Sequence, residues 1–394
     1  MPNKPNPYDI GPIFEAMTID LIRSMRRNLK NHRDEELREG FKWEQWQRAK
    51  LRNLAAYRRR NRIIISEAFK DAESLIEEVL DYSFLDGQRN VENQLDRIMR
   101  VDAEIELPTD FEPKLPDMDL PHNLLPRAPE ETSFFGINER KLDALKESVT
   151  NDINSSQNSV MRKMDDVYRQ TIYKAEVNMA AGAKTLNQAV DMATKEFLQK
   201  GINVIEYADG RRVSITAYAE MALRTASQRA TFLGEGKKRD ELGVYTVLMS
   251  AHNNCSPMCL PYQGTVMIDD VYTSLSAENA QQLSRETGYT RLSVAMENHA
   301  FHPNCRHSLS TFFPGINTIP EPVDDEQALA NYQAEQWQRY LERGIRMYKR
   351  LYEGSVDEDN KEKYRRKLRE WQQRLREHTR KHDLRRDYAR ERVS

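Results

Sequence analysis

The sequence is poor in the residues that define several common classes of protein. Only 3 of its 394 residues are cysteine and only 15 are glycine. Three cysteines cannot form a disulfide framework, so we expect a reducing, intracellular environment in which clustered thiols bind metal. The low glycine content is more typical of a helical structural protein than of a nucleotide-binding enzyme, and the chain has no glycine-rich phosphate loop.

Long apolar runs are missing as well. No stretch approaches the roughly 18 consecutive apolar residues that a membrane span needs, and residues 1–9 lack the apolar stretch of a signal peptide. We therefore expect neither a membrane span nor secretion. Catalytic signatures such as an ordered Ser/His/Asp set or HExxH are also missing, so the sequence predicts no enzymatic activity.

Charge, in contrast, is abundant and unevenly distributed. Charged residues make up 31% of the chain, yet the formal net charge is only -2. Residues 23–62 hold 14 basic and 5 acidic residues (+9), residues 361–392 hold 14 and 6 (+8), and residues 63–360 carry -17. Two basic arms thus flank an acidic body, and this wealth of charge indicates long solvated helices.

Apolar residues recur at spacings of three and four through most of the chain, which predicts amphipathic helices. The expected helices cover residues 14–29, 43–57, 63–81, 139–199, 216–242, 324–352 and 364–382. Gly201 follows the fourth pattern in the place of a helix C-cap, and Gly354 interrupts the tail. A spacing that alternates between four and three resembles a short coiled-coil seam, and it runs through Tyr364, Leu368, Trp371, Leu375, His378 and His382.

Short β-prone runs predict a small sheet among these helices. Two such runs flank Asp209-Gly210, a dipeptide typical of a tight hairpin turn. Residues 244–250 are expected to form a buried strand and residues 265–268 another. The predicted fold class is therefore α+β and predominantly α-helical, with long helices and a small β-containing Cys/His module that resembles a zinc knuckle.

Proline marks the first expected boundary, because six of the 16 prolines fall between residues 107 and 129. We divide the chain into a basic helical N-terminal domain, a Pro-rich linker, a helical segment, an α+β module with the Cys/His cluster and a basic helical tail. These cover residues 1–106, 107–136, 137–200, 201–316 and 317–394.

All three cysteines and four of the eight histidines fall in one short stretch of the chain. Cys255 and Cys259 directly follow the expected strand, and His302, Cys305 and His307 come some forty residues later. Two thiolates in a turn and a second Cys/His group can supply the four ligands that structural zinc prefers. The ligand candidates are Cys255, Cys259 and Cys305 with one of His302 or His307, and the expected cofactor is Zn²⁺.

Two other interpretations of this cluster stay open. The cysteines can be small buried hydrophobic residues with histidines that cap strands, or they can belong to a nucleophilic Cys/His enzyme. Arg306 lies between two candidate ligands, where it is expected to pair with Asp269 or Asp270, to offset the charge of a thiolate-rich site, or to be exposed.

Several runs in this region also carry a resemblance to a known family. They are residues 247–252 (VLMSAH), 262–266 (YQGTV), 302–308 (HPNCRHS) and 313–315 (FPG), preceded by residues 218–226 (YAEMALRTA) and the hairpin at Asp209-Gly210. Over roughly residues 140–315 the chain resembles the phage minor capsid protein 2 family and, more distantly, the Mu F-type head morphogenesis proteins. Many members of the first family lack a cysteine pair such as Cys255 and Cys259, so the resemblance alone does not imply a metal.

The resemblance implies a structural component of a tailed-phage head that acts near the portal in head assembly or DNA packaging and delivery. Its expected partners are portal and capsid proteins, further copies of itself and packaged DNA. It would be made in the bacterial host cytoplasm and reside in the virion. Two alternatives are a metal-dependent nuclease or toxin-like enzyme that uses the Cys/His cluster, and a zinc-stabilised nucleic-acid-binding protein.

The basic arms predict contacts with a polyanion, because clustered cations attract phosphate without sequence preference. The candidate nucleic-acid-binding residues are Arg58, Arg59, Arg60, Arg62, Arg365, Arg366, Lys367, Arg385 and Arg386. An acidic protein surface, including the acidic body of this chain, is the alternative partner. Aromatic residues interleave with both arms, but at helical spacing they are expected to pack a helix face rather than stack on bases.

Overall fold

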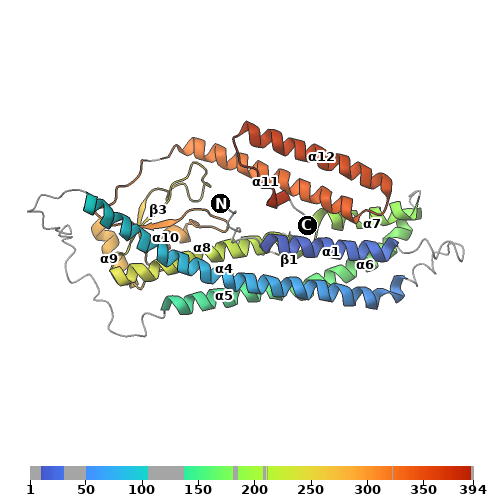
Figure 1. The fold of residues 1–394 in the computed structure, drawn as a ribbon, viewed down its shortest axis with the longest axis horizontal. Helices are drawn as coiled ribbons and strands as arrows, with labels where there is room; N and C mark the ends of the chain where they lie inside the picture. The colour runs from blue at the N-terminus through green and yellow to red at the C-terminus, as the bar shows by residue number, and fades with distance from the viewer. Residues whose placement is uncertain are drawn as a thin grey trace, which may run out of the picture. The chain divides into compact units, whose positions relative to one another are not determined.

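Helices dominate the computed structural model, which describes residues 10–30, 50–104, 137–180, 185–206, 210, 212–321 and 323–391 (Figure 1). The helices are α1 (Ile10–Lys30), α4 (Leu54–Glu104), α5 (Ile137–Ser155), α6 (Gln157–Ala180), α7 (Leu186–Lys200), α8 (Ile215–Leu242), α9 (Ala277–Thr287), α10 (Leu292–Glu297), α11 (Asp325–Gly354), α12 (Glu358–Lys381) and the 3-10 helix η1 (Ala389–Glu391). The strands are β1 (Asn203–Glu206), β2 (Arg212–Ser214), β3 (Thr246–Met249), β4 (Val266–Ile268), β5 (Thr290–Arg291) and β6 (Leu309–Thr311). The predicted fold class, α+β and predominantly helical, is confirmed. Among the described helices, none is long and apolar enough to cross a membrane.

Most predicted helices form, but the expected end of one near residue 81 is wrong. Residues 54–104 form the single helix α4, because this stretch contains no proline and only one glycine, Gly87. Gly201 caps α7 as predicted, with a φ of 70° and its N–H bonded to the carbonyl of Phe197. The segment at residues 107–136, together with Trp43 and Trp46, lies outside the described residues.

The chain forms two compact units, each assembled from segments that are distant in sequence. The first unit comprises Met1–Leu75, Thr150–Glu220 and Gln333–Ser394, and the second comprises Ile76–Val149 and Met221–Tyr332. Helices α4, α5, α8 and α11 contribute residues to both. These units group the chain by spatial contact, whereas the five sequential segments expected from composition stay a prediction.

In the first unit, apolar faces of the helices pack as their spacing predicts. Phe14 of α1 meets Phe69 of α4 edge to face at 5.2 Å between ring centroids. Tyr57 of α4 stacks on Tyr168 of α6 at 4.5 Å, which confirms that Tyr57 packs a helix face. The predicted hairpin is also present, since β1 and β2 pair antiparallel and Gly210 adopts a φ of 76°.

The turn between α11 and α12, predicted from Gly354, is held by a buried carboxylate. Asp191 of α7 accepts hydrogen bonds from the backbone N–H of Val356 (2.8 Å), from Nδ2 of Asn360 (3.0 Å) and from the Ser355 hydroxyl. Burial raises the pKa of Asp191, and these donors oppose that rise. Beyond the turn, Leu375 of α12 packs on Leu341 and Ile345 of α11.

In the second unit, α4 and α8 cross at van der Waals contact of their backbones. A Cβ atom added to Gly87 would lie 2.1 Å from the carbonyl oxygen of Thr231, and one added to Gly234 would lie 2.0 Å from that of Phe84. The hydroxyl groups of Ser83 and Ser227 bond at 2.6 Å between the same two helices. Only glycine permits so close a crossing at these positions.

A buried ion pair connects α8 to the sheet. Arg239 and Asp269 are both fully buried, and the Asp269 Oδ2 accepts from Nη2 (2.8 Å) and Nε (3.1 Å) of Arg239. The Asp269 Oδ1 accepts from the backbone N–H of Tyr272 at 2.9 Å. Glu235, one turn before Arg239, lies 3.5 Å from its Nη1. The carboxylate that follows β4 is thus fully satisfied by hydrogen bonds.

The larger sheet has the order β5-β4-β3-β6, with β3 antiparallel to β4 and β6 and with β4 parallel to β5. The expected strands at residues 244–250 and 265–268 are confirmed as β3 and β4. In the register, Leu248 pairs with Val266 and Met249 pairs with Leu309. The loop that leaves β3 and the loop that enters β6 therefore emerge at the same end of the sheet.

Gly234→Ala is expected to destabilise the second unit by about 1–3 kcal/mol, since the added methyl group must displace backbone rather than a flexible side chain. Gly11→Ala in α1 is the matched control, because its methyl group would meet only the side chain of Glu220. Chemical denaturation of both variants measures the difference. Unchanged stability of Gly234→Ala would show that the two backbones are not in contact at this position.

Glu235→Gln is expected to flatten the pH dependence of stability. Burial raises the pKa of Glu235 to about 7, although Arg239 and Asn90 oppose the rise. A carboxyl group with a raised folded-state pKa binds its proton more tightly in the folded chain, so stability falls as pH rises from about 4.3 through 7. Urea unfolding at several pH values should show a shallower fall in the variant. Glu77→Gln, an exposed position of α4 in the same unit, should keep the wild-type slope.

Candidate metal centre

Two loops at one end of the larger sheet bring the predicted metal ligands together. Cys255 and Cys259 lie in the loop between β3 and β4, and His302, Cys305 and His307 lie in the segment that leads into β6. All three cysteines are free and buried. The antiparallel register of β3 with both neighbours is the reason that segments some forty residues apart meet here.

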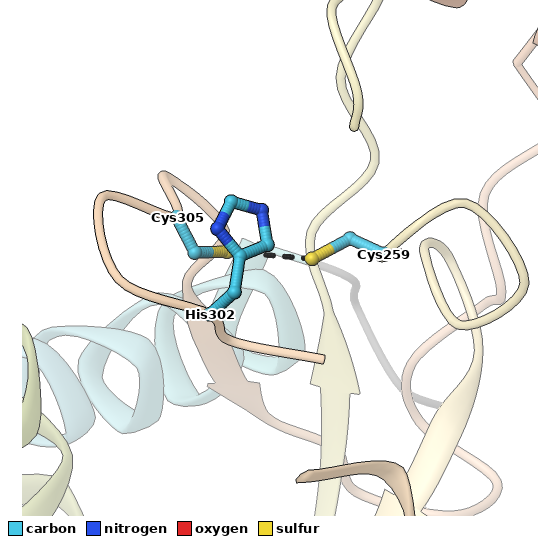
Figure 2. A group of neighbouring side chains, drawn as sticks. All are labelled: Cys259, His302 and Cys305. Atoms are coloured by element: carbon cyan, nitrogen blue, oxygen red, sulfur yellow. Dashed lines mark hydrogen bonds between the residues drawn. The ribbon is translucent and has the colours of Figure 1, made fainter. Parts of the chain in front are cut away.

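Cys259, His302 and Cys305 form the tightest group, with their ligand atoms all within 4.8 Å of one another (Figure 2). The two sulfur atoms are 3.6 Å apart. Two thiolates on one tetrahedral zinc, each at about 2.3 Å from the ion, lie about 3.8 Å apart, whereas a disulfide needs about 2.05 Å. The spacing therefore fits a shared metal ion.

The orientation of His302 presents one nitrogen to this group. Its Nδ1 lies 2.9 Å from the carbonyl oxygen of Pro303, and because a carbonyl only accepts, Nδ1 must carry the proton. The lone pair is then on Nε2, which faces the Ser256 hydroxyl at 2.7 Å. A backbone carbonyl that fixes the far nitrogen is the usual support of a metal-binding histidine.

His307 and Cys255 form a second layer beside this group. The buried His307 places Nδ1 at 3.2 Å from the Cys305 sulfur and Nε2 at 3.6 Å from the Cys255 sulfur. It also contacts Cys259. Cys255 and His307 both lie outside the tightest group, and the imidazole of His307 lies between the sulfur atoms of Cys305 and Cys255.

One sulfur of the pair has the electrostatics of a thiolate. The hydrogen bond from the Cys305 thiol, together with contacts to the imidazoles of His302 and His307, lowers the pKa of Cys259. The same bond and burial raise the pKa of Cys305. Burial raises the pKa of Cys255 to about 12, so Cys255 is a neutral thiol. The bond to Cys259 raises the pKa of His302.

The segment that carries His302 and Cys305 is held in a strained conformation. His299, Phe301 and Asn304 adopt φ values of 70°, 53° and 67°, which cost about 1–3 kcal/mol for each non-glycine residue. Packing compensates, since Phe301 meets Phe232 edge to face at 5.5 Å. The Arg224 Nη1 donates to the Asn304 Oδ1 at 2.6 Å. Strain concentrated at a cluster of this kind is typical of a functional site.

The two aspartates expected as partners of Arg306 are bonded to other groups. Asp269 is bound by Arg239, and Asp270 accepts from Ser293 and lies 3.5 Å from Arg291. Arg306 is exposed. The partner of Arg306 therefore stays a prediction.

Several predicted nucleic-acid-binding residues have partners within the chain. Arg58 bonds Asp165 at 2.6 Å, Lys367 bonds Glu370 at 2.7 Å, and Arg386 bonds Glu391 at 2.6 Å. Arg60 donates to the Asn28 Oδ1 at 2.5 Å, and Arg365 lies 3.9 Å from Glu362. Arg59, Arg62, Arg366 and Arg385 are exposed.

The aromatic residues of the tail differ in whether they pack against a helix. Tyr364 is buried in the helix pair and Trp371 packs beside the α11–α12 contact, as a helix face should. Tyr388, in contrast, is exposed and lies 4.6 Å from the guanidinium of Arg386. The sequence-based expectation of packing thus holds for the first two residues.

About half of the chain is similar to a known phage protein. A structural protein of Lactococcus phage LL-H is 22% identical to the chain over 198 residues, which are 50% of this chain and 51% of that protein. The match thus spans about half the length of that relative. None of the solved structures matches the chain. The likeness indicates a structural phage protein.

The family itself is shown by a longer match. Residues 117–380 match the family described as phage minor capsid protein 2, which is more than half of the chain. The chain belongs to that family, and the resemblance noted from its motifs is confirmed.

Proposed function

We propose that the chain is a component of the phage head that acts near the portal, in head assembly or in DNA packaging and delivery. The match of residues 117–380 to a minor capsid family carries this proposal. Its proposed partners are portal and capsid proteins, other copies of the chain and packaged DNA, and its proposed location is the virion. Membership in a structural family favours a non-enzymatic role.

We also propose that the Cys/His cluster binds one structural Zn²⁺. Cys259, Cys305 and His302 would supply three ligands and His307 the fourth, with Cys255 supporting the Nε2 of His307. The 3.6 Å sulfur separation and the fixed His302 tautomer support this set. Four protein ligands leave no open position, which is the arrangement of structural rather than catalytic zinc.

The fold gives such an ion a clear physical role. The strands of the larger sheet are two to four residues long, so few ladder hydrogen bonds hold them. An ion that joins the two loops would cross-link segments 46 residues apart at the open end of this sheet. It would also offset the strain of the loop that carries His302.

A nucleophilic enzyme is the second candidate, and the lowered pKa of Cys259 beside an imidazole is the observation that favours it. Cys259 is, however, completely buried. A nucleophile must be reached by its substrate, so the same geometry fits a metal ligand better.

Purified protein is expected to contain about one zinc ion per chain. Cys259→Ser and Cys305→Ser should lose the ion and unfold at a lower temperature, because each removes a ligand. Cys255→Ser is the matched control, and it should keep the ion. Metal analysis and thermal denaturation with and without chelator measure both effects. A metal-free protein with chelator-independent stability contradicts the proposal.

The head role is tested separately by mass spectrometry of assembled phage heads and by co-purification with portal rings. We expect the chain in intact heads at low copy number relative to the major capsid protein. Incubation with DNA and divalent metal should give no nicking, whereas nicking would support the nuclease alternative. Absence of the chain from assembled heads would falsify the head role without bearing on the zinc site.

A further inference from the structure

A depression in the first unit lies between two facing helix stripes. It has a volume of about 510 Å³ and is lined by Arg58, Asn61 and Arg62 of α4 and by Asn158, Met161, Arg162 and Asp165 of α6. Both sets follow helical spacing, so each lies on one face of its helix. The stacked pair of Tyr57 and Tyr168 fixes the two helices beside it. We call this depression the α4–α6 pocket.

The charge in the α4–α6 pocket is positive and incompletely neutralised. Its only carboxylate, Asp165, is 2.6 Å from Nε of Arg58. Within the described part of the chain, no carboxylate pairs with Arg62 or Arg162, and the Nη2 of Arg162 only approaches the Ser159 hydroxyl at 3.5 Å. Two guanidinium groups from different helices thus face one depression without a counter-charge.

The remaining polar lining is uncharged and consists of two carboxamides. Asn61 is only 4% exposed, and its Oδ1 already accepts a hydrogen bond from the Ser24 hydroxyl at 2.9 Å. Its buried Nδ2 is directed to the buried hydroxyl of Tyr57. Asn158 adds a second carboxamide to the lining. A ligand for this pocket must therefore bring negative charge and hydrogen-bond acceptors.

We propose that the α4–α6 pocket binds a phosphate of a nucleic-acid backbone, held between Arg62 and Arg162. Guanidinium groups match the phosphate oxygens in charge and in bidentate geometry. The volume of about 510 Å³ exceeds one phosphate and leaves room for the attached sugar. The exposed Arg59, on the next position of α4, extends the positive surface towards neighbouring phosphates. Contacts of this kind position DNA without reading its sequence.

This inference deepens the proposed head role, on which its biological meaning rests, by naming where the chain would meet packaged DNA. An acidic peptide could also pair with two arginines, but the proposed head role favours DNA, and competition with polyglutamate distinguishes the two. The binding step involves no bond cleavage, so it needs neither metal nor cofactor.

The double variant Arg62→Glu/Arg162→Glu tests the proposal by fluorescence anisotropy with a labelled short DNA duplex. We expect at least about a tenfold loss of affinity, and a slope of log affinity against log salt that is shallower by about 1, since one phosphate is no longer neutralised. Duplexes of different sequence should lose affinity equally. Arg62→Lys/Arg162→Lys should restore part of the binding.

The matched control is Arg97→Glu/Arg285→Glu, which makes the same charge change at two exposed helical positions outside the pocket. It should bind DNA within about twofold of the wild type. Circular dichroism and zinc content should be equal in both double variants, which separates loss of binding from loss of fold.

Three outcomes overturn the proposal. They are unchanged DNA binding by the pocket variant, an equal loss in the control, and preference of the wild type for pyrophosphate or polyglutamate over DNA. The first two assign binding to net charge or to another surface. The third assigns the pocket to a free phosphate compound or to an acidic protein. None of them alters the result of the head-incorporation experiment, so the two proposals fail independently.

Discussion

The close approach of the α4 and α8 backbones is the constraint on which the second unit depends. Gly87 and Gly234 allow each helix to touch a carbonyl of the other, and this contact sets the rotation of α8. Glu235 follows Gly234 directly, and Arg239 lies one turn further on, so the crossing directs both side chains. Arg239 then binds Asp269 at the end of β4. The contact between the two helices thereby fixes the position of the end of β4.

The same chain of contacts explains why the Cys/His cluster can form in so small a sheet. With β4 held through Asp269, the register of β3 fixes the loop of Cys259 beside the segment of His302 and Cys305. That segment carries three non-glycine residues with positive φ. Such a conformation persists only where its surroundings compensate, and Phe301, Asn304 and the sulfur–imidazole contacts supply that compensation. The packed helices therefore hold the strained segment of the Cys/His cluster in place.

Much of this could be predicted from the sequence, because helical spacing, Gly201 and the cysteine positions are local signals. The single helix α4 was missed because a change of apolar face near Asp81 looks the same in sequence as a helix end. Strands β5 and β6 have two and three residues, too few to show a period. Cys255 lies at Nε2 of His307, whereas Cys305 lies at Nδ1. The spacing of cysteines in a sequence does not predict which nitrogen of a histidine each sulfur approaches.

Charge counted along the sequence is not charge available to a partner. The N-terminal basic arm has a formal excess of +9, yet Arg58 is bound by Asp165, a residue of the acidic body. Asp165 lies one turn from Arg162, a cation that lies outside both arms and that no local count would select. Folding thus neutralises part of one arm and adds a cation from elsewhere. The electrostatic surface of unit one follows from which helices pack together, so a binding residue such as Arg162 emerges only once α6 is placed beside α4.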